Sequence, residues 1–209
     1  MFTGLIEAVG RVERLATSGP VRALRVATAL ADALRPGDSI AVNGVCLTVT
    51  AADAAGFETQ VSPETARVTT IREWREGRLV NLERPIRADA RLGGHFVLGH
   101  VDGVGGLVRL APDGECSWLD VDLPADLIPA VVSKGSIAID GISLTVAALA
   151  GTRVGVQIVP FTFAETALRQ ASAGDLVNLE TDVIGKYVAR WLADRADVGA
   201  GVARGGPRT

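Results

Sequence analysis

The sequence predicts an all-β protein of two similar domains, each a β-sandwich or a closed barrel, with one helix after them. Three observations lead to this fold class. The chain repeats itself once, short alternating hydrophobic runs are separated by Gly, Pro and Asp turn signals, and the hydrophobic spacing becomes helical only near the end. The second pattern is typical of antiparallel strands, and the third is typical of an amphipathic helix.

The repeat is clearest in two twelve-residue segments. Residues 39–50 read SIAVNGVCLTVT and residues 136–147 read SIAIDGISLTVA, with seven identical positions. The same offset of 97 (136 − 39) aligns the two LVNLE segments, and an offset of 95 (99 − 4) aligns residues 4–15 with residues 99–110. Several matches in the same order indicate a tandem duplication. Two copies of about 90 residues fit two whole domains better than a solenoid, whose repeats are shorter and more numerous.

Each repeat is predicted to contain a β-hairpin. In the first repeat, two short alternating runs surround Asn43-Gly44, a dipeptide that strongly favours a hairpin turn, and Asp140-Gly141 takes its place in the second repeat. Short helices are expected after Pro63 and after Pro160, a pair that the same offset aligns.

The end of the chain has a different pattern. Apolar residues follow Ile184 at spacings of 3, 4, 7 and 8, which places them on one helical face. Two interpretations of this stripe stay open, subunit assembly and docking on the chain's own barrel. We therefore expect an N-terminal domain (1–93), a C-terminal domain (94–183), a helix (184–197) and a disordered tail (198–209).

The composition argues against several function classes. The net charge of −3 and a pI near 5.4 give no support for nucleic-acid binding. Two cysteines are too few for a disulfide scaffold or a cysteine zinc site. No apolar run approaches the roughly 18 residues of a membrane helix, and charged residues interrupt the start where a signal peptide would need an apolar core. The cytoplasm is the expected location.

A metal site is not expected either. The chain has two histidines, His95 and His100, and residues five apart on a strand point to opposite faces. No third ligand stands out near them.

A duplicated chain suggests a pseudo-twofold site for two copies of one ligand. If the two copies react with each other, the protein can distinguish them only where equivalent positions differ. The polar differences are Cys46 against Ser143, Asn43 against Asp140 and Leu5 against His100. Each also has a plain structural interpretation, since a lone cysteine packs well in a core and Asn or Asp suits a turn.

Several motifs in order resemble a known enzyme family. They are MFTG at residues 1–4, NGVCLTVT at 43–50, GHFVLGH at 94–100, IDGISLTV at 139–146 and the two NLE endings. Together they resemble riboflavin synthase of the alpha-chain type over residues 1 to 195 or so. The resemblance implies two six-stranded Greek-key barrels related by pseudo-twofold symmetry, a C-terminal helix that joins three subunits, and no cofactor. The implied reaction is a dismutation of two 6,7-dimethyl-8-ribityllumazine molecules by four-carbon transfer.

The resemblance also implies site residues. In the family, each barrel holds one lumazine, and the active site lies between barrels of different subunits. Gly4, Leu5, Ile6 and Lys134 are expected to reach a site in the neighbouring subunit. The polar positions implicated in catalysis correspond to His100, Cys46, Ser143 and Asp182, and the positions of Ser39 and Phe2 also matter. The first pocket corresponds to Cys46, Leu47, Thr48, Gln60, Val61, Ser62, Pro63, Glu64, Thr65, Gly99, His100 and Val101, and the second to Ser143, Leu144, Thr145, Ile158, Val159, Pro160, Phe161, Thr162 and Phe163.

The chemistry of these residues suits the implied reaction. Holding two reactants face to face is expected to contribute most to the rate enhancement, with effective molarities of about 10⁵–10⁸ M. His100 is the natural proton carrier because a histidine titrates near neutrality, and Cys46 or Ser143 could activate the nucleophile that adds to the acceptor. The sequence departs from many relatives at Val45, where a second cysteine is common, and Phe161 takes the place of Glu64 in the second repeat.

Two other functions are considered. A non-catalytic lumazine- or flavin-binding protein of the same fold would be expected to lose one pocket, whereas both are retained here. A flavin-dependent oxidoreductase would need a nicotinamide-binding domain, and no Gly-rich strand-to-helix motif indicates one. The partners implied by the resemblance are two lumazines per active site, two further copies of this chain in a homotrimer, and lumazine synthase. No membrane or nucleic-acid partner is expected.

Overall fold

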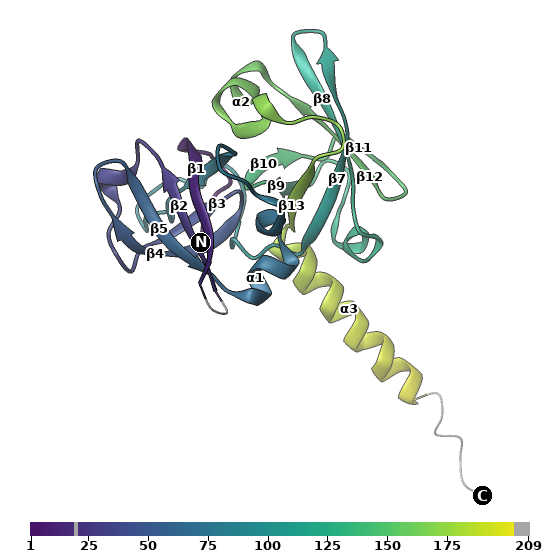
Figure 1. Cartoon of the computed structure of the whole chain (residues 1–209). Helices are drawn as coiled ribbons and strands as arrows, with labels where there is room; N and C mark the ends of the chain where they lie inside the picture. Colours follow the sequence, from purple (N-terminus) through teal and green to yellow (C-terminus); the bar gives the residue numbers. More distant parts are fainter. Residues whose placement is uncertain (19–20, 203–209) are drawn as a thin grey trace, which may run out of the picture.

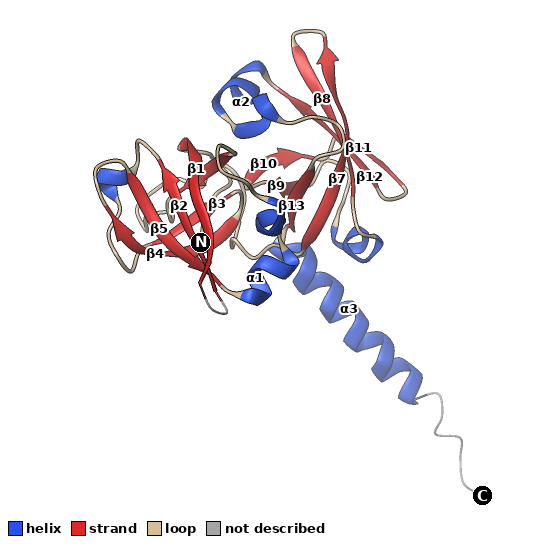
Figure 2. Cartoon of the chain, viewed as in Figure 1, coloured by secondary structure: helices blue, strands red, loops and turns tan. Residues whose placement is uncertain are grey.

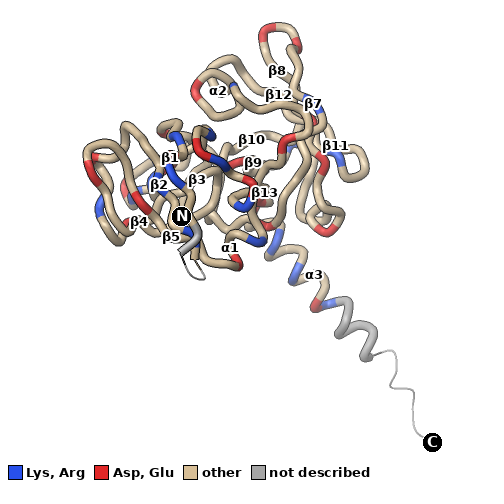
Figure 3. The backbone as a smooth tube through the Cα atoms, in the orientation of Figure 1, with Lys and Arg blue, Asp and Glu red and all other residues tan. Residues whose placement is uncertain are grey.

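The computed structural model describes residues 1–18 and 21–202 of the chain. Two β domains follow each other, and a C-terminal helix projects away from the second (Figure 1). Almost all the remaining regular structure is strand, with short helices at the domain edges (Figure 2). Positions of Lys and Arg and positions of Asp and Glu are interspersed along the backbone of both domains (Figure 3). The predicted all-β fold of two repeats with a C-terminal helix is confirmed.

The first domain is a closed barrel with the strand order β1-β2-β5-β4-β3-β6. Pairing of β1 with β6 closes it. The predicted hairpin is present, because β3 and β4 pair around Asn43 and Gly44, which both have positive φ values of 46° and 75° as a type I′ turn requires. The strands are β1 (Ala8–Ser18), β2 (Val21–Ala27), β3 (Ser39–Val42), β4 (Val45–Ala52), β5 (Gly56–Val61) and β6 (Leu79–Glu83).

The second domain repeats this order but is not a closed six-stranded barrel. Its seven strands form one curled sheet in the order β10-β9-β13-β7-β8-β12-β11. The strands are β7 (Gly103–Asp113), β8 (Cys116–Asp122), β9 (Ser136–Ile139), β10 (Ile142–Thr145), β11 (Ala148–Ala150), β12 (Arg153–Ile158) and β13 (Leu176–Thr181). Strands β10 and β11 together correspond to β4, so one strand is split in two and the sheet opens there.

One residue exchange lies beside the split. In the first barrel, the Thr59 hydroxyl donates a hydrogen bond to the Thr48 carbonyl (2.7 Å) and ties β5 to β4. At the offset of 97, the counterpart of Thr59 is Val156, which has no hydroxyl, and the counterpart of Thr48 is Thr145, where β10 ends. The expectation of a six-stranded second barrel is corrected to a curled seven-stranded sheet that is not closed.

Within the described residues, short helices connect the strands, and those that begin at Pro63 and Pro160 were predicted. They are η1 (Ala31–Ala33), α1 (Pro63–Val68), η2 (Thr70–Glu73), η3 (Ala125–Ala130), α2 (Pro160–Glu165) and η4 (Ala167–Gln170). The terminal helix α3 spans Val183–Val202 and does not end at residue 197 as expected. It continues through Gly199 and Gly201, although each glycine costs about 1 kcal/mol relative to alanine in a helix. Of the tail expected to be disordered, residues 203–209 lie outside the described residues.

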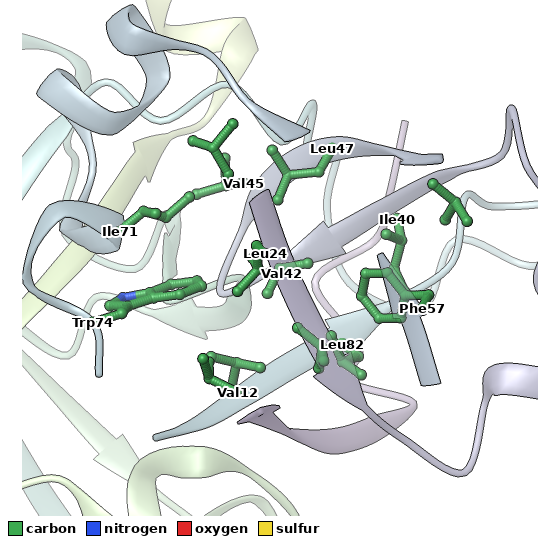
Figure 4. Close-up of a cluster of buried hydrophobic side chains, with 14 of the residues drawn as sticks. Val12, Leu24, Ile40, Val42, Val45, Leu47, Phe57, Ile71, Trp74 and Leu82 are labelled. Atoms are coloured by element: carbon green, nitrogen blue, oxygen red, sulfur yellow. The ribbon is translucent and has the colours of Figure 1, made fainter. Parts of the chain in front are cut away.

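Each domain has its own hydrophobic core. In the first, Phe57, Leu82 and Val42 point toward one another inside the barrel, and Trp74 closes one side (Figure 4). Full burial of each such side chain contributes about 1.5–3 kcal/mol. Leu119, Ile137 and their neighbours form the second core. None of the helices within the described residues is long and apolar enough to cross a membrane.

Candidate functional site

The two repeats meet where their hairpin turns touch. A Cβ atom on Gly44 would lie 2.8 Å from the Gly141 nitrogen, so only glycine allows this approach. The Asn81 amide donates to the Asp140 carbonyl (2.9 Å), and the Asn178 amide donates to the Asn43 carbonyl (2.9 Å). The asparagines of the two LVNLE segments therefore join the repeats in a reciprocal, pseudo-twofold arrangement.

Asn43 and Asp140 occupy equivalent places at this interface but differ in side chain, so the symmetry is not exact. Asn43 Oδ1 accepts a hydrogen bond from Asn81 N (2.6 Å), and Asp140 Oδ1 accepts one from Asn178 N (2.8 Å). Both are turn residues, as the structural interpretation expected. Burial raises the pKa of Asp140 from 3.8 to about 7, although the hydrogen bond from Asn178 opposes the shift. Both line a cavity of about 210 Å³ at the interface.

The segments that open the two repeats pair with each other. We name residues 2–6 the first lead and residues 97–101 the second lead. Phe2 N donates to Val97 O (2.7 Å), and Val97 N donates to Phe2 O (3.1 Å). Phe2 was expected at a catalytic position, but its side chain is fully buried between the repeats. It supports the leads and does not face a pocket.

A buried glutamate anchors each lead to its own repeat. Glu83 accepts hydrogen bonds from the Thr3 and Gly4 nitrogens (2.6 and 2.9 Å) and from the Thr3 hydroxyl (2.7 Å). Glu180 accepts three backbone hydrogen bonds from residues 98–100, at 2.7–3.1 Å. Burial raises the pKa of both carboxyls, and these donors act in the opposite direction. The leads are thus held in place by hydrogen bonds that they donate to buried carboxyl groups.

Each lead then crosses to the strand of the other repeat. The Gly99 carbonyl accepts a hydrogen bond from Cys46 N (2.9 Å), and the Gly4 carbonyl accepts one from Ser143 N (2.8 Å). The first lead was expected to reach a neighbouring subunit, but within this chain it lies beside Ser143. Val101 packs against the first core and Ile6 against the second. Every pocket is therefore built from both repeats.

We define the first pocket as the surface formed by Cys46 and Thr48 on β4, the start of α1 and the second lead. Cys46 is half-buried and Thr48 is exposed. Ser39 pairs with Thr48 across the β3–β4 ladder and lies half-buried beside it. Ser62 caps α1 by accepting a hydrogen bond from Thr65 N (3.1 Å). His100, in the second lead, is exposed. The structure thus places Ser39 beside Thr48, and Gly99, which precedes His100, beside Cys46.

The second pocket has the corresponding parts, namely Ser143 and Thr145 on β10, the start of α2 and the first lead. It differs at the helix, because Val159 takes the place of Ser62 and gives α2 no side-chain cap. Phe161, the counterpart of Glu64, is 76% exposed, so it offers an apolar face where the first pocket has an ion pair between Glu64 and Arg67. The two pockets therefore share a plan but differ in polarity.

Some predicted pocket residues point away from the surface. Their side chains belong to the two cores, so they can meet a ligand only through their backbone atoms. These residues are Leu47, Val61, Leu144 and Ile158. Lys134 is exposed in the turn before β9, has a φ of 66°, and donates from its backbone to the Val146 carbonyl (2.8 Å) next to Thr145.

One polar residue at the second pocket was not predicted from the sequence. His95 is buried, and its Nδ1 lies 2.7 Å from Ser143 Oγ. Burial lowers the pKa of His95, and the charge of Asp182 opposes that shift. Asp182 itself accepts a hydrogen bond from Ile184 N (2.9 Å) at the start of α3. The sequence gives little indication of this contact, because His95 and Ser143 are 48 residues apart and the repeat alignment does not match one with the other.

Comparisons with known proteins agree with this architecture. The lumazine binding domain family matches the chain twice, over residues 3–85 and 98–182. A riboflavin synthase of Bacillus amyloliquefaciens is 42% identical over 193 residues, covering 92% of this chain and 90% of that protein. A riboflavin synthase of Mycobacterium bovis is 43% identical over 205 residues, covering 92% and 98%. The crystal structure of LumP complexed with riboflavin has a similar fold, with a TM-score of 0.81 at 22% identity over 87% of this chain and 99% of that one.

Proposed function

The chain belongs to the riboflavin synthase family, and from this membership we propose that it is a transferase that converts two molecules of 6,7-dimethyl-8-ribityllumazine into riboflavin and 5-amino-6-(D-ribitylamino)uracil. One lumazine gives up a four-carbon unit and the other receives it. The atoms balance between two substrates and two products, so no oxidant or reductant is consumed.

The observation that carries this proposal is the presence of two complete lumazine-binding repeats. Both keep a half-buried polar residue, Cys46 or Ser143, followed by the same Leu-Thr pair on an accessible strand. A protein that only stores one ligand needs one such surface. Two surfaces suit a reaction between two identical molecules, because holding both converts a bimolecular encounter into an internal step.

The residues of the two pockets supply binding and proton transfer. Thr48 and Thr145 lie exposed at equivalent places and can pair with polar atoms at the edge of a pteridine ring. His100 lies exposed beside the first pocket, and its imidazole is the group we propose to carry a proton between the reactants. Cys46 and Ser143 differ between the pockets, so they suit the unequal roles of donor and acceptor.

We further propose that the active site forms between subunits and that α3 assembles them as a homotrimer. All five side chains of its predicted apolar stripe are more than half exposed in the single chain, namely Ile184, Tyr187, Val188, Trp191 and Leu192. Near the N-terminus of α3, Lys186 forms an ion pair with Asp102 (2.7 Å). Such an exposed apolar stripe is typical of an interface between protein chains.

Association with lumazine synthase and a cytoplasmic location are further proposals that derive from the family resemblance. Co-purification from cell extract tests the first, and cell fractionation tests the second.

Turnover of purified protein tests the central proposal. Incubation with 6,7-dimethyl-8-ribityllumazine should yield one riboflavin for every two lumazines consumed, followed by absorbance and fluorescence. Tight binding without product would favour a non-catalytic binding protein instead. Val188→Glu should dissociate the assembly and abolish turnover, while Arg190→Glu on the same helix serves as a control for added charge. A wild-type chain that is monomeric and fully active would refute the inter-subunit site.

A further inference from the structure

His95 lies directly before the second lead and is placed by the main chain of the first. Its side chain is 7% exposed, and its backbone nitrogen donates to the Thr3 carbonyl (3.1 Å). A Cβ atom on the preceding Gly94 would lie 2.0 Å from that carbonyl oxygen, so only glycine permits this approach. The imidazole is thereby held with Nδ1 at 2.7 Å from Ser143 Oγ.

The first pocket is built differently at the equivalent place. The counterpart of Ser143 is Cys46, and a thiol is a weak hydrogen-bond donor. The chain's other histidine, His100, follows Gly99 and is exposed. Among the described residues, a buried imidazole bonded to a pocket side chain occurs only at Ser143.

The surroundings of His95 determine where its hydrogen sits. Burial lowers the pKa of His95 in spite of the opposing charge of Asp182, so the ring is neutral at neutral pH and carries one N–H. Within residues 1–18 and 21–202, its buried Nε2 has no hydrogen-bond partner. Among backbone groups, a buried N–H without a partner is rarer than an unpaired carbonyl, and we apply the same preference to the two ring nitrogens of His95. The hydrogen therefore belongs on Nδ1, which donates it to Ser143 Oγ.

This assignment leaves the hydroxyl hydrogen of Ser143 free. The backbone of Ser143 is fixed by its hydrogen bond to Gly4 O (2.8 Å), and its side chain is only half-buried. With one lone pair occupied by the imidazole, the hydroxyl can donate only away from His95. The accessible direction is the pocket.

We propose that His95 is a positioning residue of the second pocket, which orients the Ser143 hydroxyl as a hydrogen-bond donor toward an acceptor atom of the bound pteridine ring. This inference rests on the proposed function. Its consequence is that two identical lumazines meet unequal environments, because the ring in the second pocket loses electron density to a fixed donor and the ring beside Cys46 does not. That difference can assign the roles of donor and acceptor.

Three substitutions at one position test the proposal by activity. The Asn side-chain amide is attached at the same point as Nδ1 and can still donate to Ser143, whereas the Gln amide lies one carbon farther, near the place of Nε2. We expect kcat/KM to fall about tenfold for His95→Leu and His95→Gln, which corresponds to about 1.4 kcal/mol, and about threefold or less for His95→Asn. Thermal unfolding of each variant shows whether it is folded. Equal losses in folded Asn and Gln variants would overturn the proposal.

A double-mutant cycle separates positioning from packing. In a Ser143→Ala background, His95→Leu should cause no further loss of kcat/KM, because there is no hydroxyl left to orient. An equal loss in both backgrounds would show that His95 only fills space, and the proposal would be wrong.

Nitrogen NMR of wild-type protein with labelled histidine gives a readout that does not require activity or a stable variant. We expect the hydrogen of His95 on Nδ1 at neutral pH. A hydrogen on Nε2 overturns the inference even if the enzyme makes riboflavin. A wild-type protein with the Nδ1 tautomer but no turnover would refute the proposed function and leave the oriented hydroxyl standing.

Discussion

Replacing Asp140 by asparagine should stabilise the protein at neutral and alkaline pH and have little effect in acid. Asp140 lies at the pseudo-twofold interface, where the other repeat has Asn43 in the same turn. Asparagine keeps an oxygen that can accept the hydrogen bond from Asn178 N, now 2.8 Å from Asp140 Oδ1. It removes the cost of burying a charge, which asparagine does not carry.

The size of the effect follows from the pKa of Asp140. Burial raises it from 3.8 to about 7 in the folded protein. The unfolded chain therefore releases this proton first as the pH rises, so the contribution of Asp140 to stability is fully present below 3.8 and is lost between 3.8 and about 7. At 1.36 kcal/mol per pKa unit, the full loss is about 4 kcal/mol.

Denaturant unfolding at a fixed protein concentration measures this difference across the pH range. The gap in unfolding free energy between Asp140→Asn and wild type should widen from about pH 4 and level off above about pH 7. Asn43→Asp is the matched control, since it buries a second carboxyl in the equivalent turn and should lose stability over the same range. If the wild type and Asp140→Asn respond identically to pH, the buried carboxyl is not the cause and the reasoning fails.

Two further predictions concern the fold that carries the pockets. Gly44→Ala should destabilise the protein by at least about 2 kcal/mol, because a Cβ at φ +75° would meet Gly141 at 2.8 Å. Gly37→Ala is the control, since Gly37 has a φ of +96° with open space around it and reports the cost of the backbone conformation alone. An equal loss of stability in both variants would show that the close contact with Gly141 is not the cause. Thr59→Val should cost about 1 kcal/mol by removing the 2.7 Å hydrogen bond to the Thr48 carbonyl, and hydrogen exchange should show weaker protection along β4; unchanged protection would mean that the hydroxyl does not hold the strand.

Each pocket contains residues of both repeats, and this affects how the activity of variants should be interpreted. The second lead belongs to the second repeat, is anchored by Glu180, and reaches Cys46 through Gly99. A substitution in one repeat can therefore disturb the pocket of the other. Replacing Phe2, which is fully buried where the leads pair, should displace both leads and lower activity without the loss of any side-chain contact with substrate.

Several features of this protein are determined by local sequence. The repeat, the hairpin turns and the short helices after Pro63 and Pro160 depend on residues close together in the chain, and all were predictable. Alternation with a period of two places side chains on the faces of a strand, and Asn-Gly or Asp-Gly supplies the positive φ values of the turn. The same local motifs identify the family.

Tertiary structure alone decided how the pockets are assembled. The exchange of the leads, the burial of Phe2 and the contact of His95 with Ser143 join residues between 48 and 139 positions apart (143 − 4 = 139). The opening of the second sheet beside Val156 likewise involves pairing between different strands. Periodicity and turn chemistry describe neighbours in sequence. They do not specify which distant backbone groups satisfy each other, because that choice is made only when the two domains pack.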